Sequence, residues 1–181
     1  MSKKLDQLAK DIEARFGEQV SDVHLMHDEL TIEVPPESLH AVCQILHDDK
    51  ALHFRMLVDI AGVDYLHYGQ DEWATQTTTL TGFDRGVESG DASLGVSKWT
   101  KPRFAVVYHL LSIKLNLRLR VKTFLDEANL AVDTVSDIWP AANWFEREAF
   151  DLFGILFNGH PDLRRILTDY GFVGHPFRKD F

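Results

Sequence analysis

Cysteine is almost absent from the 181-residue chain, in which Cys43 is the single example. One thiol excludes an internal disulfide, and it excludes a zinc or iron–sulfur site made from four cysteines of this chain. Residues 1–17 lack the apolar core of a signal peptide and carry more acids than a transit peptide does. These features favour a reducing compartment.

Long apolar runs and basic stretches are missing too. No run approaches the roughly 20 residues that cross a bilayer. The net charge is −9; residues 1–101 hold 18 acids against 9 Lys and Arg, and residues 102–181 hold 10 of each. Because neither half is basic, nucleic acid is not an expected partner. The composition, 45% hydrophobic and 26% charged, predicts one soluble domain with a real core.

The motifs of several enzyme classes are also absent. Neither G-x-G-x-x-G nor G-x-x-x-x-G-K-[ST] occurs, so the common nucleotide cradles are excluded. Neither H-E-x-x-H nor G-x-S-x-G occurs, which argues against zinc proteases and the usual serine hydrolases.

The first 66 residues predict a helix, a hairpin, a second helix and a buried strand. Helical spacing of apolar residues ends at Gly17, and residues 23–34 read as a hairpin whose second strand alternates apolar and polar. Pro35-Pro36 ends that hairpin and opens the next helix. The strand over residues 54–66 contains Asp59 and Asp64 beside a glycine, which suggests either ordinary turn residues or a cation site.

Residues 69–102 form a long irregular loop, in which Thr77 to Thr79 could add a short edge strand. Residues 103–112 are apolar on both faces, as in a central strand. Residues 115–124 alternate strictly and pair with them across Ile113-Lys114. The outer basic stripe of this last strand is either a solvated face or a docking surface for an acidic partner.

These elements predict an α+β fold, with a mostly antiparallel sheet, packed helices, and then a helix that leads into an extended C-terminal hook. We expect a sheet domain over residues 1–143, and a signature helix with an interface hook over residues 144–181.

Four charged residues, Glu146, Arg147, Glu148 and Asp151, lie on the last helix. A helical wheel places Phe145, Ala149, Leu152, Phe153 and Leu156 on one arc, and Arg147, Glu148 and Asp151 on the opposite, exposed arc. Glu146 falls at the edge of the apolar arc, so we expect it to be partly buried. Arg164, Arg165 or Arg178 is the expected partner for it. Arg147 and Asp151 should pair on the exposed side.

The hook, residues 159–181, repeats one unit. Gly159-His160-Pro161 precedes Arg164-Arg165, and Gly174-His175-Pro176 precedes Arg178-Lys179. Glycine permits positive φ and proline fixes its own φ, so each unit predicts a defined turn that aims a cationic pair. Tyr170, Phe172, Phe177 and Phe181, interleaved with arginines, are typical of an interface.

Two histidine pairs invite a metal, His24 with His27 and His160 with His175. The first pair lacks a suitable third ligand nearby in the sequence, so a metal is not expected. Glu146 and Glu148 could instead serve a stand-alone carboxylate-dependent hydrolase, but a structural or interface role for these charges is favoured.

The spacing Glu146-Arg147-Glu148, Asp151-Leu152-Phe153, His160, then 164–172 and 174–181, closely resembles the C-subunit family of the proton-pumping NADH:quinone oxidoreductase, respiratory complex I. Residues 57–65 and 104–112 are similar to that family as well. A related component of a membrane-bound hydrogenase or ferredoxin-linked complex is an alternative within the same resemblance.

The resemblance implies a non-catalytic subunit of the peripheral arm on the cytoplasmic side of a bacterial inner membrane. It implies no cofactor in this chain, while NADH, FMN, iron–sulfur clusters and quinone are used by other subunits. The implied partner is the D-subunit homologue, which helps to form the quinone site, so membrane association comes only through the complex. In two places this chain departs from what the resemblance implies. The family is expected to have a shorter loop where this chain has residues 69–102, and many members are expected to continue for a short segment after the position of Phe181.

Overall fold

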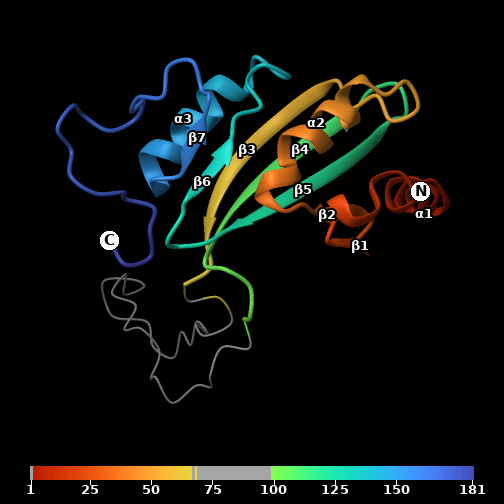
Figure 1. Cartoon of the computed structure of the whole chain (residues 1–181), viewed down its shortest axis with the longest axis horizontal. Helices are drawn as coiled ribbons and strands as arrows, with labels where there is room; N and C mark the ends of the chain where they lie inside the picture. The colour runs from red at the N-terminus through yellow and green to blue at the C-terminus, as the bar shows by residue number, and fades with distance from the viewer. Residues whose placement is uncertain (1, 67, 69–98) are drawn as a thin grey trace, which may run out of the picture.

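A five-stranded sheet carries the fold (Figure 1) in a computed structural model that describes residues 2–66, 68 and 99–181. The strand order is β1-β2-β5-β4-β3, made by β1 (Asp22–Met26), β2 (Glu29–Glu33), β5 (Leu117–Leu125), β4 (Phe104–Ser112) and β3 (Met56–Asp64). β2 and β5 pair in parallel, and the other neighbouring strands pair antiparallel. The predicted α+β class is confirmed, with a mixed sheet.

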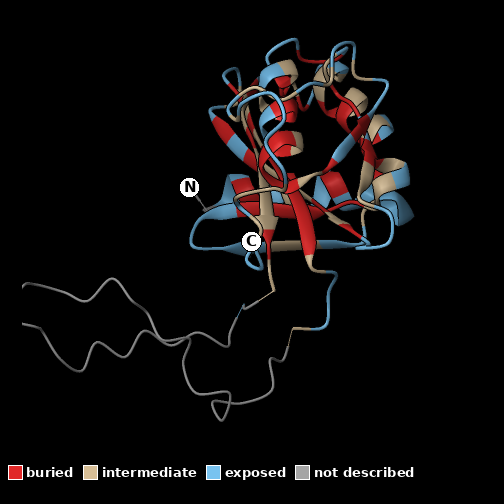
Figure 2. Cartoon of the chain, turned by 90° about the vertical axis from the view of Figure 1, so that its left-hand side faces the viewer, coloured by how far each residue is buried: buried red, intermediate tan, exposed pale blue. Residues whose placement is uncertain are grey.

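Three α-helices pack beside this sheet: α1 (Ser2–Phe16), α2 (Leu39–Asp48) and α3 (Ala142–Phe153). Short 3-10 turns, η1 (Gly17–Gln19) and η2 (Pro36–Ser38), end α1 and introduce α2, as the glycine and the proline pair predicted. α2 crosses in front of the sheet, while α3 and α1 lie toward opposite ends of it (Figure 1). Buried residues gather on the strands and on the inner sides of these helices (Figure 2).

The β1–β2 hairpin turns at His27 and Asp28, whose φ angles are 53° and 60°. Two positive φ angles match the mirror-image turns that fit the twist of paired strands. The alternation read along β2 does not mean that one of its faces is exposed. Thr31 and Glu33 are buried along with their apolar neighbours, because other side chains cover them: Arg120 bonds to Thr31, and Lys101 pairs with Glu33.

Two strand boundaries differ from the prediction. β3 begins at Met56 rather than at Phe54, since His53, with a φ of 52°, turns the chain just before it. β5 begins at Leu117 rather than at Leu115, because the connection from β4 is a four-residue turn over residues 113–116. Asn116 closes that turn at a φ of 53°, which asparagine tolerates better than most residues do.

A second, two-stranded parallel sheet was not predicted. It pairs β6 (Ala131–Asp133) with β7 (Leu156–Asn158) on either side of α3 in the sequence. α3 ends at Phe153, because Gly154 takes the left-handed conformation at a φ of 76°. Leu156 is therefore in β7 and exposed, and its predicted place on the helix is wrong.

The predicted edge strand at Thr77 to Thr79 lies outside the described residues, as does most of the predicted loop over residues 69–102. The division of the chain at residue 143 stays a prediction. α3 packs against β3 at Gly62, where a Cβ would lie 2.5 Å from the Phe153 ring.

Candidate functional site

The signature helix α3 is buried on more than one side. Glu146, Arg147 and Asp151 are buried together with its apolar residues, and only Glu148 of the four signature charges is exposed. The wheel correctly placed Ala149, Leu152 and Phe153 against the core. Its exposed arc is wrong for Arg147 and Asp151, because the hook wraps over that arc and a helical wheel takes no account of a covering segment.

Glu146 bonds to the end of β6 and not to an arginine. Its Oε1 accepts a hydrogen bond of 2.8 Å from the backbone N–H of Val135, and its Oε2 accepts one from the hydroxyl of Thr134. The predicted partners, Arg164, Arg165 and Arg178, all bond elsewhere. Burial without a bonded cation raises the pKa of Glu146 to about 7, although the two hydrogen bonds oppose that rise.

His160 lies beside Glu146, with its side chain fully buried and its Nε2 3.9 Å from the carboxylate. The Nε2 atom is 3.1 Å from the carbonyl oxygen of Asn143, and Nδ1 accepts a bond of 3.0 Å from the backbone N–H of Asp162. Nδ1 as an acceptor fixes the proton on Nε2, which donates to the Asn143 carbonyl. His160 thus ties the start of the hook to the first turn of α3.

Arg147 holds the backbone of the hook. Its Nε donates to the carbonyl oxygen of Arg164 at 3.1 Å, and its Nη2 donates to that of Arg165 at 3.3 Å. The predicted pair between Arg147 and Asp151 on an exposed face is therefore absent among these contacts. Both side chains lie under the hook, where each binds a different part of it.

Asp151 is the most heavily bonded of the signature charges. Its carboxylate accepts from the backbone N–H groups of Ile166 (3.0 Å), Leu167 (2.7 Å) and Thr168 (2.9 Å), and from Arg165 at 2.9 Å. The Thr168 hydroxyl also donates to it, at 2.5 Å. Burial alone would raise the pKa of Asp151, but these donors outweigh burial and hold the pKa well below its ordinary value.

Arg165, a residue of the hook, makes several hydrogen bonds around Asp151. Besides Asp151, it donates to the Thr168 hydroxyl at 3.1 Å and to the carbonyl of Gly174 at 3.0 Å. The Gly174 contact links the first turn unit of the hook to the second. Arg165 therefore serves the hook internally and does not extend toward a neighbour.

The second turn unit closes over the C-terminal end of α3. His175 Nδ1 lies 2.9 Å from the Asp151 carbonyl oxygen, and Arg178 Nε donates to the Phe153 carbonyl at 2.7 Å. These two carbonyls belong to the last turn of α3, where the helix itself supplies no donors. The Arg178 guanidinium also lies over the Phe104 ring, 5.1 Å from its centroid.

An ion-pair cluster at the ends of β3 and β4 receives the end of the hook. Arg103 binds Asp64 through two nitrogens, at 2.8 and 2.9 Å, and also binds Asp180 at 2.6 Å. The backbone N–H of Lys179 donates to Asp64 at 2.9 Å. Burial would raise the pKa of Asp64, but Arg103 and the backbone donors outweigh it and lower the pKa. Asp64 thus belongs to this cluster, which the sequence did not predict.

A signal for this cluster existed in the sequence. Asp64 and Arg103 come at the end of one apolar strand and immediately before the next, so antiparallel pairing of the two strands brings opposite charges together. Asp59, by contrast, lies on the outer face of the sheet, 3.9 Å from His109.

The two turn units of the hook have the predicted backbone, with φ of 77° at Gly159 and 99° at Gly174. Each unit was predicted to aim a cationic pair, but the two cations of each pair point in different directions. Arg164 is exposed and bonds to Asp162 at 2.8 Å, whereas Arg165 and Arg178 turn inward. Lys179 has an exposed side chain and uses its backbone N–H on Asp64.

The exposed side chains of the hook include large apolar ones, beside charged ones such as Arg164 and Lys179. Tyr170 is 91% exposed and Val173 is 86% exposed, far above the level of ordinary apolar residues. Further exposed apolar side chains of the hook are Leu167, Phe172, Phe177 and Phe181. The prediction that its aromatics are exposed is confirmed.

The outer face of the sheet carries its own charged row. Arg120 of β5 donates to His109 of β4 at 3.1 Å and to Thr31 of β2 at 3.4 Å, and it pairs with Glu29. One cation of the basic stripe predicted on β5, Arg120, is thus paired with an acid of a neighbouring strand. Only Arg118 of its cations is fully exposed.

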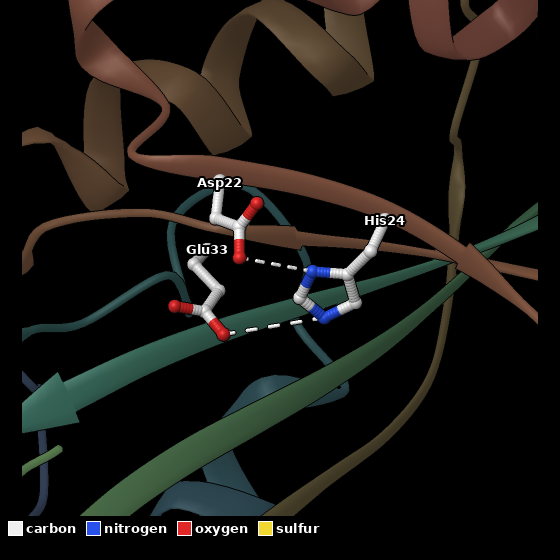
Figure 3. A group of neighbouring side chains, drawn as sticks. All are labelled: Asp22, His24 and Glu33. Carbon is white, nitrogen blue, oxygen red and sulfur yellow. Dashed lines mark hydrogen bonds and ion pairs between the residues drawn. The ribbon is translucent and has the colours of Figure 1, made fainter. Parts of the chain in front are cut away.

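Two carboxylates lie beside His24, which the sequence paired with His27 without a third metal ligand. Its Nδ1 lies 3.1 Å from Asp22 and its Nε2 lies 4.0 Å from Glu33 (Figure 3). The two carboxylates face opposite nitrogens of the ring, and Lys101 pairs with Glu33. The three residues offer ligand atoms within 4.8 Å of one another, but His24 already contacts Asp22 and Glu33 already pairs with Lys101, so these contacts are those of an ion-pair chain.

Glu146 and Glu148 cannot serve one substrate as an acid and base, because one is buried behind Thr134 and the other is exposed on another side of α3.

A groove of about 540 Å³ lies close to Glu146, and Thr134 is part of its lining. Its other lining residues are His40, Asp133, Ser136, Asp137, Asn158, Gly159 and Pro161.

The sequence profile of a known family, described as "Respiratory-chain NADH dehydrogenase, 30 Kd subunit", matches residues 32–181. The chain belongs to this family. The C subunit of the NADH-quinone oxidoreductase of Legionella pneumophila (strain Paris) is 52% identical to it over 178 residues, which are 98% of this chain and 78% of the relative. The protein of the same name from Coxiella burnetii (strain Dugway 5J108-111) is 54% identical over 170 residues, 94% of this chain and 74% of the relative. The resemblance read from the signature residues is confirmed.

Solved structures agree with this family. The trypsin-resistant fragment (1-134) of Nqo5 is 29% identical, has a TM-score of 0.60, and matches 88% of this chain and 99% of its own. A chain of an archaeal membrane-bound sulfane sulfur reductase has a TM-score of 0.68 at 23% identity, matching 98% of this chain and 85% of its own, which shows a shared fold alone. Within the described residues, no helix is both long and apolar enough to cross a membrane.

Proposed function

We propose that this chain is a non-catalytic scaffold of complex I, in which its hook docks onto neighbouring subunits of the peripheral arm. The observation that supports this most directly is the direction in which the side chains of the hook point. Its charged side chains Arg165 and Arg178 bond inward, while Tyr170 and Val173 face solvent. Large exposed apolar side chains on a fixed backbone are typical of interface anchors.

The internal bonds give the hook the rigidity that docking needs. Residues 159–181 contain no helix or strand, yet α3 holds them at Arg147 and Asp151, and Arg103 holds their end. A segment that is already ordered loses less conformational entropy on binding than a flexible tail would. Such a segment can therefore use its exposed apolar area for affinity.

The D-subunit homologue, which contributes to the quinone site, is the partner that we propose for the hook. Electron transfer from NADH to quinone, and the proton translocation coupled to it, would then use NADH, FMN, iron–sulfur clusters and quinone in other subunits. The chain would reach the cytoplasmic side of the inner membrane only through that assembly. The family membership and the names of the relatives support the place of this chain in complex I, whereas the choice of partner rests on the resemblance of the signature residues.

The test removes exposed apolar side chains and leaves intact the bonds of Arg147, Asp151 and Arg165 that fix the hook. We expect the double variant Tyr170→Ala, Val173→Ala to fold normally, because both side chains lie outside the core. Loss of interface anchors costs about 2 kcal/mol or more each, so co-purification with the companion subunits from native membranes should fall at least 30-fold. Ile113→Ala is the matched control, since Ile113 is 72% exposed on the β4–β5 turn.

Mass identification of the companions decides between related complexes. Companions of an NADH:quinone oxidoreductase support the proposal, whereas those of a membrane-bound hydrogenase or a ferredoxin-linked complex support the alternative. Full assembly and full activity with the double variant would show that the hook surface is not the anchor.

A further inference from the structure

We propose that Glu146 is a reversible proton-binding site that exchanges its proton with the adjoining groove through the hydroxyl groups of Thr134 and Ser136. This inference is independent of the docking role of the hook. It concerns a buried group whose surroundings differ from those of the other signature charges. Arg147 and Asp151 bond to the hook, whereas Glu146 bonds to the turn that follows β6.

The geometry forms a continuous chain of three groups. Glu146 Oε2 accepts from the Thr134 hydroxyl, and Thr134 Oγ1 lies 2.8 Å from Ser136 Oγ. Thr134 and Ser136 both line the groove of about 540 Å³, whereas Glu146 itself is fully buried. The two hydroxyl groups therefore bridge the distance between the buried carboxylate and solvent.

Each hydroxyl group can donate one hydrogen bond and accept others, so the chain can run in either direction. When Glu146 is ionised, the Ser136 hydroxyl donates to Thr134 and the Thr134 hydroxyl donates to the carboxylate. When Glu146 is protonated, it donates to Thr134 and Thr134 donates to Ser136. One proton entering at Ser136 from the groove, followed by one hop at each hydroxyl, converts the first arrangement into the second with all atoms balanced.

Two fixed donors keep the chain in place during this exchange. The backbone N–H of Val135 holds Oε1 at 2.8 Å, and the backbone N–H of Ser136 donates to Thr134 Oγ1 at 3.1 Å. Both bonds can form in either protonation state, because Oε1 remains an acceptor when Oε2 carries the proton, although the Val135 bond is stronger to the ionised carboxylate. The turn can therefore stay formed in both protonation states.

The charges around Glu146 favour a proton. Asp137, in the same turn, repels a second negative charge, and it is bonded at 2.9 Å to His40 of α2 across the groove. Just after β7, the His160 ring faces the carboxylate at 3.9 Å, with its proton directed to the Asn143 carbonyl. On α3 itself, Arg147 and Asp151 are committed to the hook.

Two more titratable groups lie behind Glu146 in the core, Cys43 of α2 and Tyr108 of β4. Burial raises the pKa of the Cys43 thiol and that of the Tyr108 phenol, so both stay neutral. No bonded cation therefore compensates the carboxylate within the described residues, and burial raises the pKa of Glu146 to about 7.

The carboxylic-acid band of the infrared spectrum tests the proposal on the full chain. Ordinary carboxyl groups, with pKa values of about 4, are almost wholly ionised at pH 6. We expect one carboxylic-acid band to persist at pH 6 and to vanish with a midpoint near pH 7. The band should remain in Glu148→Gln, which changes the exposed neighbour on the same helix, and be lost in Glu146→Gln. A wild-type chain without such a band at pH 6 overturns the proposal, whatever the folding of the variants.

The route is tested by the rate at which the band shifts after transfer to heavy water. Ser136→Ala removes the outer hydroxyl without touching Glu146, so it should leave the midpoint unchanged and slow the shift at least tenfold. Thr134→Val should slow the shift and raise the midpoint, because the carboxylate loses a donor. Equal rates in wild type and both variants would overturn the proposed route.

Linkage to folding gives an independent readout. Since the pKa of Glu146 is raised in the folded chain above the ordinary value of 4.5, its contribution to stability is fully present below pH 4.5 and is lost as the pH rises through 7. The urea midpoint of Glu146→Gln should therefore vary less between pH 4.5 and 7 than that of the wild type. Parallel midpoint profiles would contradict the assignment.

Discussion

Asp151→Asn should release the hook while leaving the sheet folded. Asparagine keeps the shape of the side chain and one acceptor oxygen, but its NH₂ group faces backbone N–H donors of residues 166–168 and leaves Arg165 without its charge partner. Removal of one member of a buried, hydrogen-bonded ion pair costs about 3–5 kcal/mol. Leu163 is the only residue of the hook that packs against the hydrophobic core of the described residues. The substitution should therefore destabilise the hook before it destabilises the sheet.

Amide hydrogen exchange measures the effect residue by residue. A local cost of about 3–5 kcal/mol corresponds to exchange about 100- to 4,000-fold faster at Ile166, Leu167 and Thr168, when opening is a rapid equilibrium that precedes exchange. Amides of β4 should keep their protection. Glu148→Gln is the matched control, because Glu148 is exposed one turn from the same contacts. Unchanged protection at residues 166–168 in Asp151→Asn would refute the view that α3 holds the hook.

The contacts of Asp151 also predict how the stability of the hook depends on pH. The pKa of Asp151 is depressed in the folded chain, so its stabilising contribution is present above the ordinary value of 3.8 and is lost as the pH falls through the folded value. Protection of the hook amides should thus persist at pH 5 and decline on acidification below about pH 4. In Asp151→Asn this acid-dependent part of the decline should be missing.

Three further substitutions test other parts of the fold by urea unfolding. Tyr108→Phe should stabilise the chain by about 1 kcal/mol or be neutral, because the buried hydroxyl has no partner in the described part of the structure. Gly62→Ala should cost about 1–3 kcal/mol, since the new Cβ would lie 2.5 Å from the Phe153 ring. Asp64→Asn should cost about 3–5 kcal/mol, because the fully buried side chain of Asp64 loses its charge and leaves the half-buried Arg103 without its main partner.

Local patterns along the chain predicted most of the sheet domain. Helical spacing located α1 and α2, a run that is apolar on both faces located β4, and alternation located most of β5. The parallel pair β6–β7 was missed for a physical reason. Each of its strands has three residues, too few for a period, and the two come together only because α3 folds back between them.

The signature charges were located from the sequence, but their partners were not. A helical wheel describes one covered face, whereas α3 is covered by the sheet on one side and by the hook on another. Arg147 and Asp151 bond to backbone groups of residues 164–168, and a backbone group leaves no mark on the sequence pattern. The partner of Glu146, Thr134, lies just after β6, so missing that strand also hid the carboxylate's environment.

The signature residues and the exposed residues of the hook contribute to docking in different ways. Arg147, Asp151, His160 and Arg165 fix the hook within the chain, so changes in them would weaken docking by disordering the hook rather than by removing a contact with a partner. Tyr170 and Val173 have most of their side-chain surface in solvent, so changes in them act mainly at the interface. A loss of assembly that is accompanied by faster amide exchange in the hook belongs to the first group, and a loss without it belongs to the second.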